Sequence, residues 1–178
     1  EVWAVTLRNA GSRTRRLSLF SYVEFCVLQA VMDMQDFQYT LNIARAERRG
    51  RVLLHLTNYF PRAGRHDLTF FGVDRPLTGF DCDREAFIGP YRSEAKPRVV
   101  VEGRSTNSVA SGGNPVGSHW LRLTLRAGES TTIRFVLGTA RSPADAQRLL
   151  RRYGAPGTVA RQRERLAAHW EESLGRLV

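Results

Sequence analysis

The chain has almost no lysine. Lys96 is the only lysine among 27 basic residues, so the net charge of +10 rests on arginine. An excess of basic residues favours binding to nucleic acid, because lysine and arginine neutralise the backbone phosphates. However, the arginines are dispersed along the chain without an aromatic-rich RNA-binding motif, and an arginine-biased coding background is the simpler explanation. We therefore expect no nucleic-acid partner, and a basic nucleic-acid binder stays an alternative.

Long apolar runs are also missing. No stretch approaches the roughly 20 residues that span a bilayer, and no basic-then-apolar leader stands at Glu1. We expect no membrane partner and a cytoplasmic location. The 178 residues suffice for one domain with a substantial core. Because the chain opens directly on the strand-like run Val2–Leu7 without an initiator Met, we expect it to be part of a longer protein.

Cysteine and histidine are too scattered to form common site motifs. Cys26 and Cys82 have no metal-ligand spacing, and two reduced, buried thiols are favoured over a disulfide. The four histidines form no i, i+4 pair, so we expect no metal site. His119 is expected to be a hydrogen-bonded structural residue rather than a catalytic one. Gly112-Gly113 lacks the lysine and the spacing of a phosphate loop, which disfavours nucleotide chemistry.

Short alternating runs dominate the first 140 residues. Apolar and polar residues alternate in Glu1–Asn9 and in Arg16–Phe25, which we expect to form an antiparallel pair. A strong hairpin is predicted from residues 121–125 to 133–137 around the turn at Ala127-Gly128-Glu129. Many short strands without intervening helices predict a mainly β fold, an antiparallel β-sandwich. Further strands are expected at Thr40–Arg45, Arg51–Tyr59, Leu68–Val73 and Val99–Val101.

The last 38 residues predict helices. Ser142 is a suitable N-cap with Pro143 at the first helical position, and the helix should continue to a stop at Gly154. A second helix, capped by Thr158, should carry one apolar face, which is expected to pack on the sandwich or on a following domain. We place the boundary between a sandwich domain, 1–140, and a helical linker, 141–178. The apolar face consists of Leu166, Trp170, Leu174 and Leu177.

The segment GFDCDREAFIGPYR at 79–92 is dense in turn-forming and charged residues, which is typical of a specified loop. Asp81 and Asp83 resemble the carboxylate pair that glycosidic chemistry uses. They flank Arg84 and a Gly/Pro-rich turn, however. The favoured interpretation is that both accept loop N–H groups and pair with Arg84 or Arg92. We assign no catalytic residue to the chain.

Several motifs in the same order along the chain resemble the cellobiose phosphorylase family, glycoside hydrolase family 94, formerly glycosyltransferase family 36. The motifs are SLFSYVEFC (18–26), DMQDFQ (33–38), GFDCDREAFIGPYR (79–92), NSVASG (107–112), NPVGSHWLRLTLRAGES (114–130), FVLG (135–138) and HWEESLGRL (169–177). The resemblance implies part of the family's N-terminal super-sandwich followed by its helical linker. The family's catalytic (α/α)6 barrel, which carries the general acid and the phosphate site, is absent from this chain.

The resemblance also implies a function. Family members are inverting phosphorylases in which inorganic phosphate, a co-substrate rather than a cofactor, cleaves a β-linked disaccharide such as cellobiose. The sandwich mediates homodimer formation, and an excursion after SLFSYVEFC reaches the partner's active site, where a Gln-Arg pair contacts sugar. Gln38 and Tyr39 occupy those positions here. Because Tyr39 lacks the cationic fork of arginine, either altered acceptor specificity or loss of this contact follows.

Besides the nucleic-acid binder named above, the sequence leaves two functions open. The first is the non-catalytic sandwich and linker portion of a disaccharide phosphorylase. The alternative is a stand-alone module for carbohydrate binding or dimerisation without enzymatic activity. An incomplete sandwich leaves open strand edges and an uncovered apolar face, so we expect the isolated chain to have poor solubility.

Overall fold

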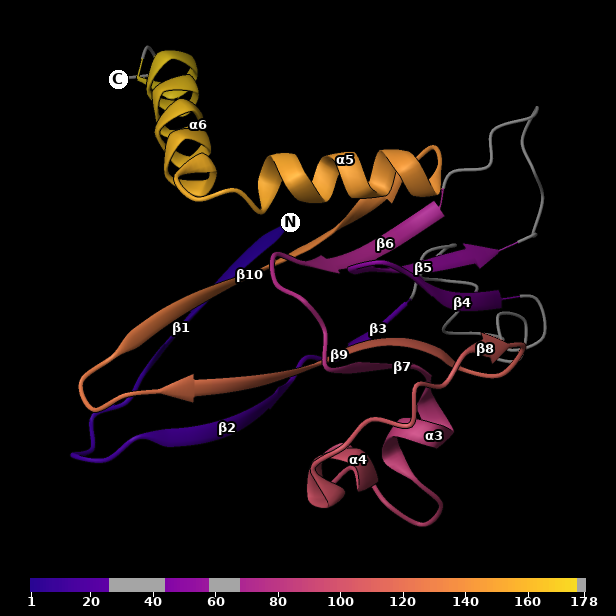
Figure 1. The fold of residues 1–178 in the computed structure, drawn as a ribbon. Helices are drawn as coiled ribbons and strands as arrows, with labels where there is room; N and C mark the ends of the chain where they lie inside the picture. The colour runs from indigo at the N-terminus through magenta and orange to yellow at the C-terminus, as the bar shows by residue number, and fades with distance from the viewer. Residues whose placement is uncertain (26–43, 58–67, 176–178) are drawn as a thin grey trace.

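The fold is a sandwich of two antiparallel sheets with helices at its margins (Figure 1). The computed structural model describes residues 1–25, 44–57 and 68–175. The predicted fold class, antiparallel β structure followed by C-terminal helices, is confirmed. No helix within the described ranges is both long enough and apolar enough to cross a bilayer.

Among the described residues, the larger sheet has six strands in the order β1-β10-β6-β5-β4-β8. Their order differs from the order of the sequence, since β10 lies between β1 and β6. Every pairing within this sheet is antiparallel. The strands are β1 (Val2–Arg8), β4 (Ala44–Arg49), β5 (Val52–Thr57), β6 (Leu68–Val73), β8 (Ala110–Ser111) and β10 (Ser130–Ala140).

The smaller sheet is built around β9 (Pro115–Leu125). The segment predicted as the second strand, Arg16–Phe25, forms two strands in the structure. These are β2 (Arg15–Phe20) and β3 (Val23–Glu24), and both pair with β9. β7 (Gly79–Asp83) also pairs with β9. The long strand β9 therefore holds together three segments that lie far apart in the sequence.

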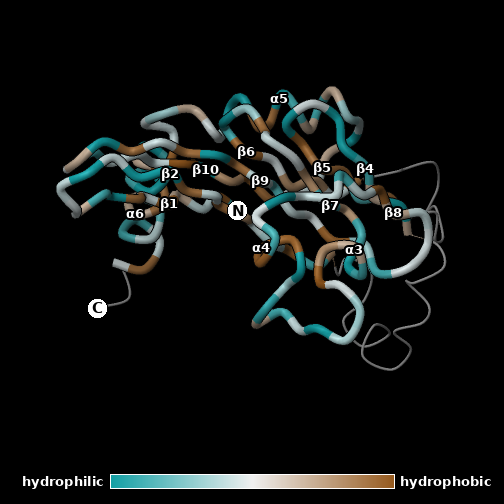
Figure 2. Tube along the Cα trace, turned by 60° about the horizontal axis from the view of Figure 1, so that its bottom comes forward, coloured by the Kyte–Doolittle hydropathy of each residue, from teal (hydrophilic) through white to brown (hydrophobic). Residues whose placement is uncertain are grey.

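The main core lies between the two sheets. Alternate residues of each strand point inward, as the period of two requires. Figure 2 shows hydrophobic stretches along the middle strands β5, β6 and β10, whereas the loop that follows α3 (Arg84–Ile88) is hydrophilic. The buried members of this core include Val23, Phe25, Ala46, Leu53, Phe71, Val73, Phe80, Cys82, Leu121, Leu123, Ile133 and Phe135.

The helix α5 (Pro143–Tyr153) covers part of the outer face of the larger sheet. The predicted N-cap is confirmed, because the Ser142 hydroxyl oxygen accepts a hydrogen bond from the Asp145 N–H at 3.1 Å. Ala146 and Leu150 are buried against Phe70 and other outward-facing residues of β5, β6 and β10. A second apolar layer therefore forms behind the sandwich core.

The last helix, α6 (Thr158–Leu174), projects away from the sandwich (Figure 1). The predicted cap is wrong by one position: Gly157, with φ 77°, is the N-cap and Thr158 is the first helical residue. The predicted apolar face does not pack on the sandwich along its length. Leu166, Trp170 and Leu174 each expose more than half of their surface, and Leu177 lies outside the described residues.

Two expected strand pairings are wrong. β1 does not pair with β2, because β1 pairs with β10 in the larger sheet and β2 pairs with β9 in the smaller one. The expected hairpin between β9 and β10 fails for the same reason, since the chain changes sheet at the turn between them. Alternation shows which residues share a face of a strand, but it does not select the neighbouring strand.

The expected strand at Val99–Val101 is also wrong, because these residues form the short helix α4 (Arg98–Glu102). Pro97 precedes the helix, and Gly103 ends it with φ 68°. Val99 is fully buried against Phe87 and Ile88 of α3. Three β-branched residues favour a strand locally, and packing against α3 overrides that preference.

Candidate functional site

The two predicted sugar-contacting residues, Gln38 and Tyr39, lie outside the described residues, and so does Cys26. The structure does show how the flanking residues are held. Phe25, after β3, stacks on His55 of β5 with the ring centres 4.9 Å apart. The Ala44 carbonyl, at the start of β4, accepts a hydrogen bond from the Gly112 N–H at 2.9 Å. The attachment points of residues 26–43 are therefore both buried in one end of the sandwich.

The neighbouring β7–α3 segment contains the two aspartates that could suggest a catalytic pair. Asp83 is the N-cap of α3, and its Oδ1 accepts a hydrogen bond from the Ala86 N–H at 2.7 Å. A carboxylate at a helix N-cap satisfies a backbone donor that has no partner inside the helix. The structural interpretation of Asp83 is confirmed.

Asp81 is fully buried and accepts hydrogen bonds from the loop after α4. Its Oδ1 is 3.0 Å from the Thr106 N and 3.3 Å from the Ser108 N. The hydroxyls of Thr106 and Ser108 donate to the same oxygen. Because Asp81 is fully buried and its Oδ1 is already bound by several donors of the protein, it has no access to a leaving group. Its expected role as an acceptor of N–H groups is confirmed.

The predicted ion pairs of these aspartates are wrong. Within the described residues neither Asp81 nor Asp83 pairs with Arg84 or Arg92. Arg84 instead binds Glu24 of β3, with Nε 2.9 Å from Oε1, and also binds Glu94. The side chain of Arg84 points across to β3, because β3 and β7 both pair with β9.

Glu24 lies at the centre of a small polar network. The Tyr22 hydroxyl donates to its Oε1 at 2.6 Å, and Arg84 donates to the same atom. Partial burial alone would raise the pKa of Glu24, but the hydrogen bonds from Tyr22 and Arg84 outweigh it and lower the pKa. Burial and the contact with Glu24 raise the pKa of Tyr22. The network holds a carboxylate in its charged form, and it ties α3 to the strand that precedes residues 26–43.

The buried histidines are structural. His119 is fully buried, its Nδ1 lies 3.0 Å from the Ser21 hydroxyl, and burial lowers its pKa to about 3. Its ring packs on Phe71, with the centres 4.6 Å apart. Burial also lowers the pKa of His55 to about 4. The prediction of a structural His119 is confirmed, because a neutral imidazole enclosed by aromatic rings has no access to a substrate.

Cys82 is a free thiol inside the sandwich core, as predicted. Burial raises its pKa to about 12, with smaller contributions from the nearby carboxylates of Asp81, Glu47 and Asp83. A thiol in this environment stays protonated and unreactive at neutral pH. No cluster of three potential metal ligands occurs within residues 1–25, 44–57 and 68–175.

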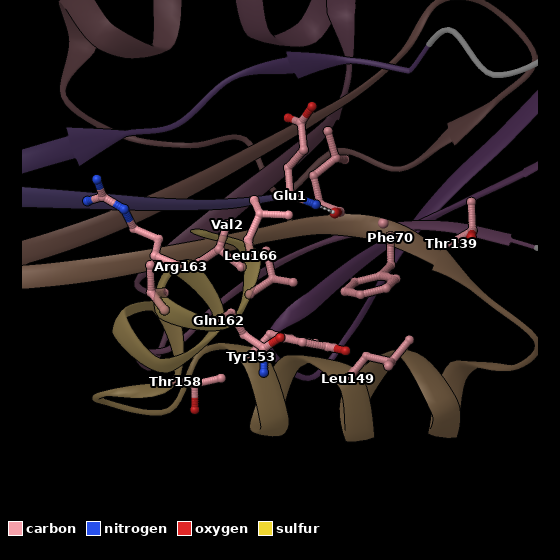
Figure 3. A pocket seen from close by; sticks show the side chains of 14 residues that line it. Glu1, Val2, Phe70, Thr139, Leu149, Tyr153, Thr158, Gln162, Arg163 and Leu166 are labelled. Atoms are coloured by element: carbon pink, nitrogen blue, oxygen red, sulfur yellow. Dashed lines mark hydrogen bonds between the residues drawn. The ribbon is translucent and has the colours of Figure 1, made fainter. Parts of the chain in front are cut away.

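An apolar groove of about 480 Å³ lies between the outer face of the larger sheet and the start of α6 (Figure 3). Val2 and Phe70 form its wall on the sheet side, while Leu149 and Tyr153 line it from α5. Leu166 of α6 closes the other side. The groove therefore joins the apolar surface of the sheet to the exposed apolar face of α6, and Asp81, Asp83 and His119 do not line it.

Sequence reasoning missed the network around Glu24. Part of the signal was in the sequence, because Tyr22 and Glu24 are two residues apart and share one face of the predicted strand Arg16–Phe25. The arginine that completes the network is 60 residues away from Glu24, and no local pattern indicates that contact. The network fixes the base of the segment that carries Gln38 and Tyr39.

The family model described as "Glycosyl hydrolase 94, supersandwich domain" matches residues 1–156. The chain belongs to this family. The match spans both sheets of the supersandwich and the helix α5. The resemblance to glycoside hydrolase family 94 that the sequence motifs indicated is therefore confirmed.

Several relatives of the supersandwich chain are phosphorylases. An N,N'-diacetylchitobiose phosphorylase of Vibrio proteolyticus is 30% identical over 173 residues, which cover 97% of this chain and 21% of that protein. A solabiose phosphorylase of Paenibacillus borealis is 28% identical over 170 residues, or 94% of this chain and 22% of that protein. A cyclic beta-(1,2)-glucan synthase of Rhizobium meliloti is 24% identical over 173 residues, which are only 6% of its length. The chain spans about one fifth of the length of its phosphorylase relatives.

Proposed function

We propose that the chain is the supersandwich and linker part of an inverting disaccharide phosphorylase, which uses inorganic phosphate to cleave a β-linked glucoside reversibly. The supporting observation is that the chain aligns over 97% and 94% of its length with phosphorylases that act on different disaccharides. Inverting phosphorolysis needs one protein carboxyl as acid, because phosphate takes the place of the activated water of an inverting hydrolase. That acid would come from a catalytic barrel in the same enzyme.

The supersandwich would contribute to substrate binding and to dimerisation rather than to bond cleavage. The described carboxylates near the base of residues 26–43 support this division. Asp81 and Asp83 are occupied by backbone donors, and Glu24 is bound by Tyr22 and Arg84. These contacts form a rigid frame from which Gln38 and Tyr39 would reach the sugar site of a second copy in a homodimer.

The direct test is phosphorolysis by the complete gene product. The protein is incubated with inorganic phosphate and a panel of β-linked disaccharides, and released sugar 1-phosphate is quantified. We expect sugar 1-phosphate from at least one disaccharide and none when phosphate is omitted. Hydrolysis without phosphate incorporation, or no turnover of any disaccharide, would contradict the proposal. Sugar binding without turnover would favour a stand-alone carbohydrate-binding module.

Substitutions in the same enzyme test the sugar contact. Gln38→Ala should raise the KM for the disaccharide about tenfold, because one hydrogen bond to a sugar hydroxyl in an enclosed site is worth roughly 1.4 kcal/mol. Tyr39→Arg should change the ranking of acceptor sugars in the synthetic direction, because it introduces a forked cationic donor. Gln162→Ala, at an exposed position of α6, is the matched control. Unchanged KM and acceptor ranking in both site variants would remove these residues from the sugar site.

A further inference from the structure

Four arginines line one hollow on the outer side of the larger sheet. The hollow has a volume of about 420 Å³ and lies where the end of α5 meets the start of β5 and the end of β6. Arg51 precedes β5, Arg75 follows β6, Arg134 lies in β10 and Arg151 lies in the last turn of α5. We call it the arginine pocket. Its other lining residues include Asp74, Thr132 and Gly154.

Backbone hydrogen bonds to neighbouring strand ends hold two of the arginines in place. The Arg51 carbonyl accepts from the Val73 N–H at 3.2 Å, and the Arg134 carbonyl accepts from the Asp74 N–H at 3.0 Å. The guanidinium groups are then oriented by neutral acceptors. Arg51 donates to the Asp74 carbonyl at 2.7 Å, and Arg75 donates to the Thr132 carbonyl at 3.0 Å. These side chains are ordered before any ligand arrives, which lowers the cost of binding.

The charges in the pocket do not balance. Asp74 is the only carboxylate among the lining residues that the structure describes, and it faces Arg134, with Oδ2 3.3 Å from Nη1. Arg51, Arg75 and Arg151 form no ion pair within the described part of the chain. The carbonyl end of α5 adds a partial negative charge that Arg151 offsets. Four arginines against one carboxylate leave three positive charges, which the helix end reduces to about 2.5, and a concave surface concentrates their field.

Most of the guanidinium donors in the pocket are unused. Each guanidinium carries five N–H groups. Only four hydrogen bonds from these arginines to protein acceptors occur among the described residues, and Arg151 makes none of them. A set of fork-shaped donors that converge from different sides suits a tetrahedral oxyanion better than a planar carboxylate, which one or two forks can satisfy.

We propose that the arginine pocket binds an oxyanion of the phosphate class, either inorganic phosphate or the phosphate group of a sugar phosphate. Arg75 and Arg134 would hold the anion from the sheet, and Arg151 would close on it from α5. The proposal rests on this geometry alone and does not depend on the proposed phosphorylase function. Inactivity of the complete enzyme would leave it standing.

Isothermal calorimetry on the chain of 178 residues tests the pocket. Inorganic phosphate is titrated at constant ionic strength, and we expect saturable binding at one site. Arg151→Gln should weaken binding about tenfold, the usual effect of losing one charge-assisted hydrogen bond. The Arg151 side chain makes no hydrogen bond or ion pair within the described residues, so its replacement by glutamine should leave the chain folded. Arg75→Gln should weaken binding similarly, provided that its urea midpoint matches the unmodified chain.

Arg165→Gln is the charge-matched control, since Arg165 is an exposed residue of α6 and is not a pocket residue. Equal weakening by Arg165→Gln, or wild-type affinity of Arg151→Gln, would overturn the proposal. Absence of binding at about 10 mM phosphate, tenfold above a millimolar Kd, would overturn it as well. Titration of glucose 1-phosphate distinguishes a sugar phosphate from inorganic phosphate as the ligand, because the pocket should bind its own ligand more tightly than the other. Binding of duplex DNA alone, without phosphate heat, would also overturn it.

Discussion

Single buried polar residues define much of this structure. Asp81 accepts hydrogen bonds from a loop that lies 25 or more residues further along the chain, and His119 bonds to Ser21 across 98 residues. Each of these side chains is fully buried. A buried polar group without a hydrogen-bond partner is costly, so each of these contacts favours a particular arrangement of distant segments.

The burial of His119 predicts a pH-dependent stability. Burial lowers the pKa of His119 to about 3, whereas an unfolded histidine titrates near pH 6.5. Below about pH 6.5 the unfolded chain therefore binds a proton that the folded chain refuses. The contribution of His119 to the free energy of unfolding is complete above pH 6.5 and falls by about 1.4 kcal/mol per pH unit as the pH drops toward 3.

Urea unfolding between about pH 7 and pH 4.5 measures this effect. His119→Asn keeps a polar atom near Ser21 but removes the titrating ring. In this variant the free energy of unfolding should fall less steeply with falling pH, by about 1.4 kcal/mol per pH unit, which corresponds to one proton. His55 contributes a similar decline, because burial lowers its pKa to about 4, and it remains in this variant. His169→Asn on the exposed face of α6 should keep the original slope. An unchanged slope in His119→Asn would contradict the assignment of a buried neutral His119.

At the scale of elements, two turns hold the sandwich together at one end. The chain changes sheet between β1 and β2 and again between β9 and β10, and both turns lie at the same end of the molecule (Figure 1). Asn9 joins them. Its side-chain amide lies 2.8 Å from the Arg13 carbonyl, 3.0 Å from the Leu125 carbonyl and 2.9 Å from the Arg126 carbonyl. The backbone of Asn9 also bonds to Gly128 and Glu129.

Substitution of Asn9 should therefore destabilise the whole sandwich. Asn9→Ala removes the buried donors and should lower the free energy of unfolding by about 3 kcal/mol, since several carbonyls lose their partners. Asn9→Asp should cost more, because a carboxylate would face three carbonyl oxygens. Urea unfolding monitored by tryptophan fluorescence gives both values. Asn114→Ala, at an exposed position, is the control. Equal stability of Asn9→Ala and Asn114→Ala would refute the role of Asn9 as a link between turns.

At the scale of the whole molecule, apolar surface remains uncovered. The face of α6 formed by Leu166, Trp170 and Leu174 is more than half exposed and adjoins the apolar groove beside α5. β1 and β2 each pair on one side only within the described part of the chain, and Trp3 of β1 and Leu17 of β2 are about 40% exposed. Open edges and apolar patches favour association, in line with the expected poor solubility, which stays a prediction.

Removal of the apolar face of α6 should reduce that association. The double variant Trp170→Glu with Leu174→Glu should sediment with less aggregate than the unmodified chain. Its urea midpoint should change little, because exposed positions away from the core usually alter stability by about 0.5 kcal/mol or less. Sedimentation velocity measures the distribution. Arg163→Gln with Arg165→Gln changes the net charge by the same amount and leaves the apolar face intact. If this control reduced aggregation equally, charge rather than apolar contact would be responsible.

The sequence predicted features that depend on neighbours in the chain. The helix α5 was predicted with its cap and its end, because Ser142, Pro143 and Gly154 act within a few residues. The role of Asp83 as an acceptor of N–H groups was also predictable from the turn around it. The helix α4 was not, since Val99 takes its conformation from packing on Phe87 and Ile88 of α3. The sugar-contacting roles of Gln38 and Tyr39 stay predictions.

The sequence by itself determined which side chains share a face of each main strand, where α5 begins and ends, and to which family the chain belongs. Only the tertiary structure decided that β1 lies beside β10, that Arg84 binds Glu24, and that four arginines from separate segments meet in one pocket. The physical reason is the range of the forces involved. Backbone preferences and alternation act over a few residues, whereas strand partners and charge clusters depend on loop closure and on burial shared between distant segments.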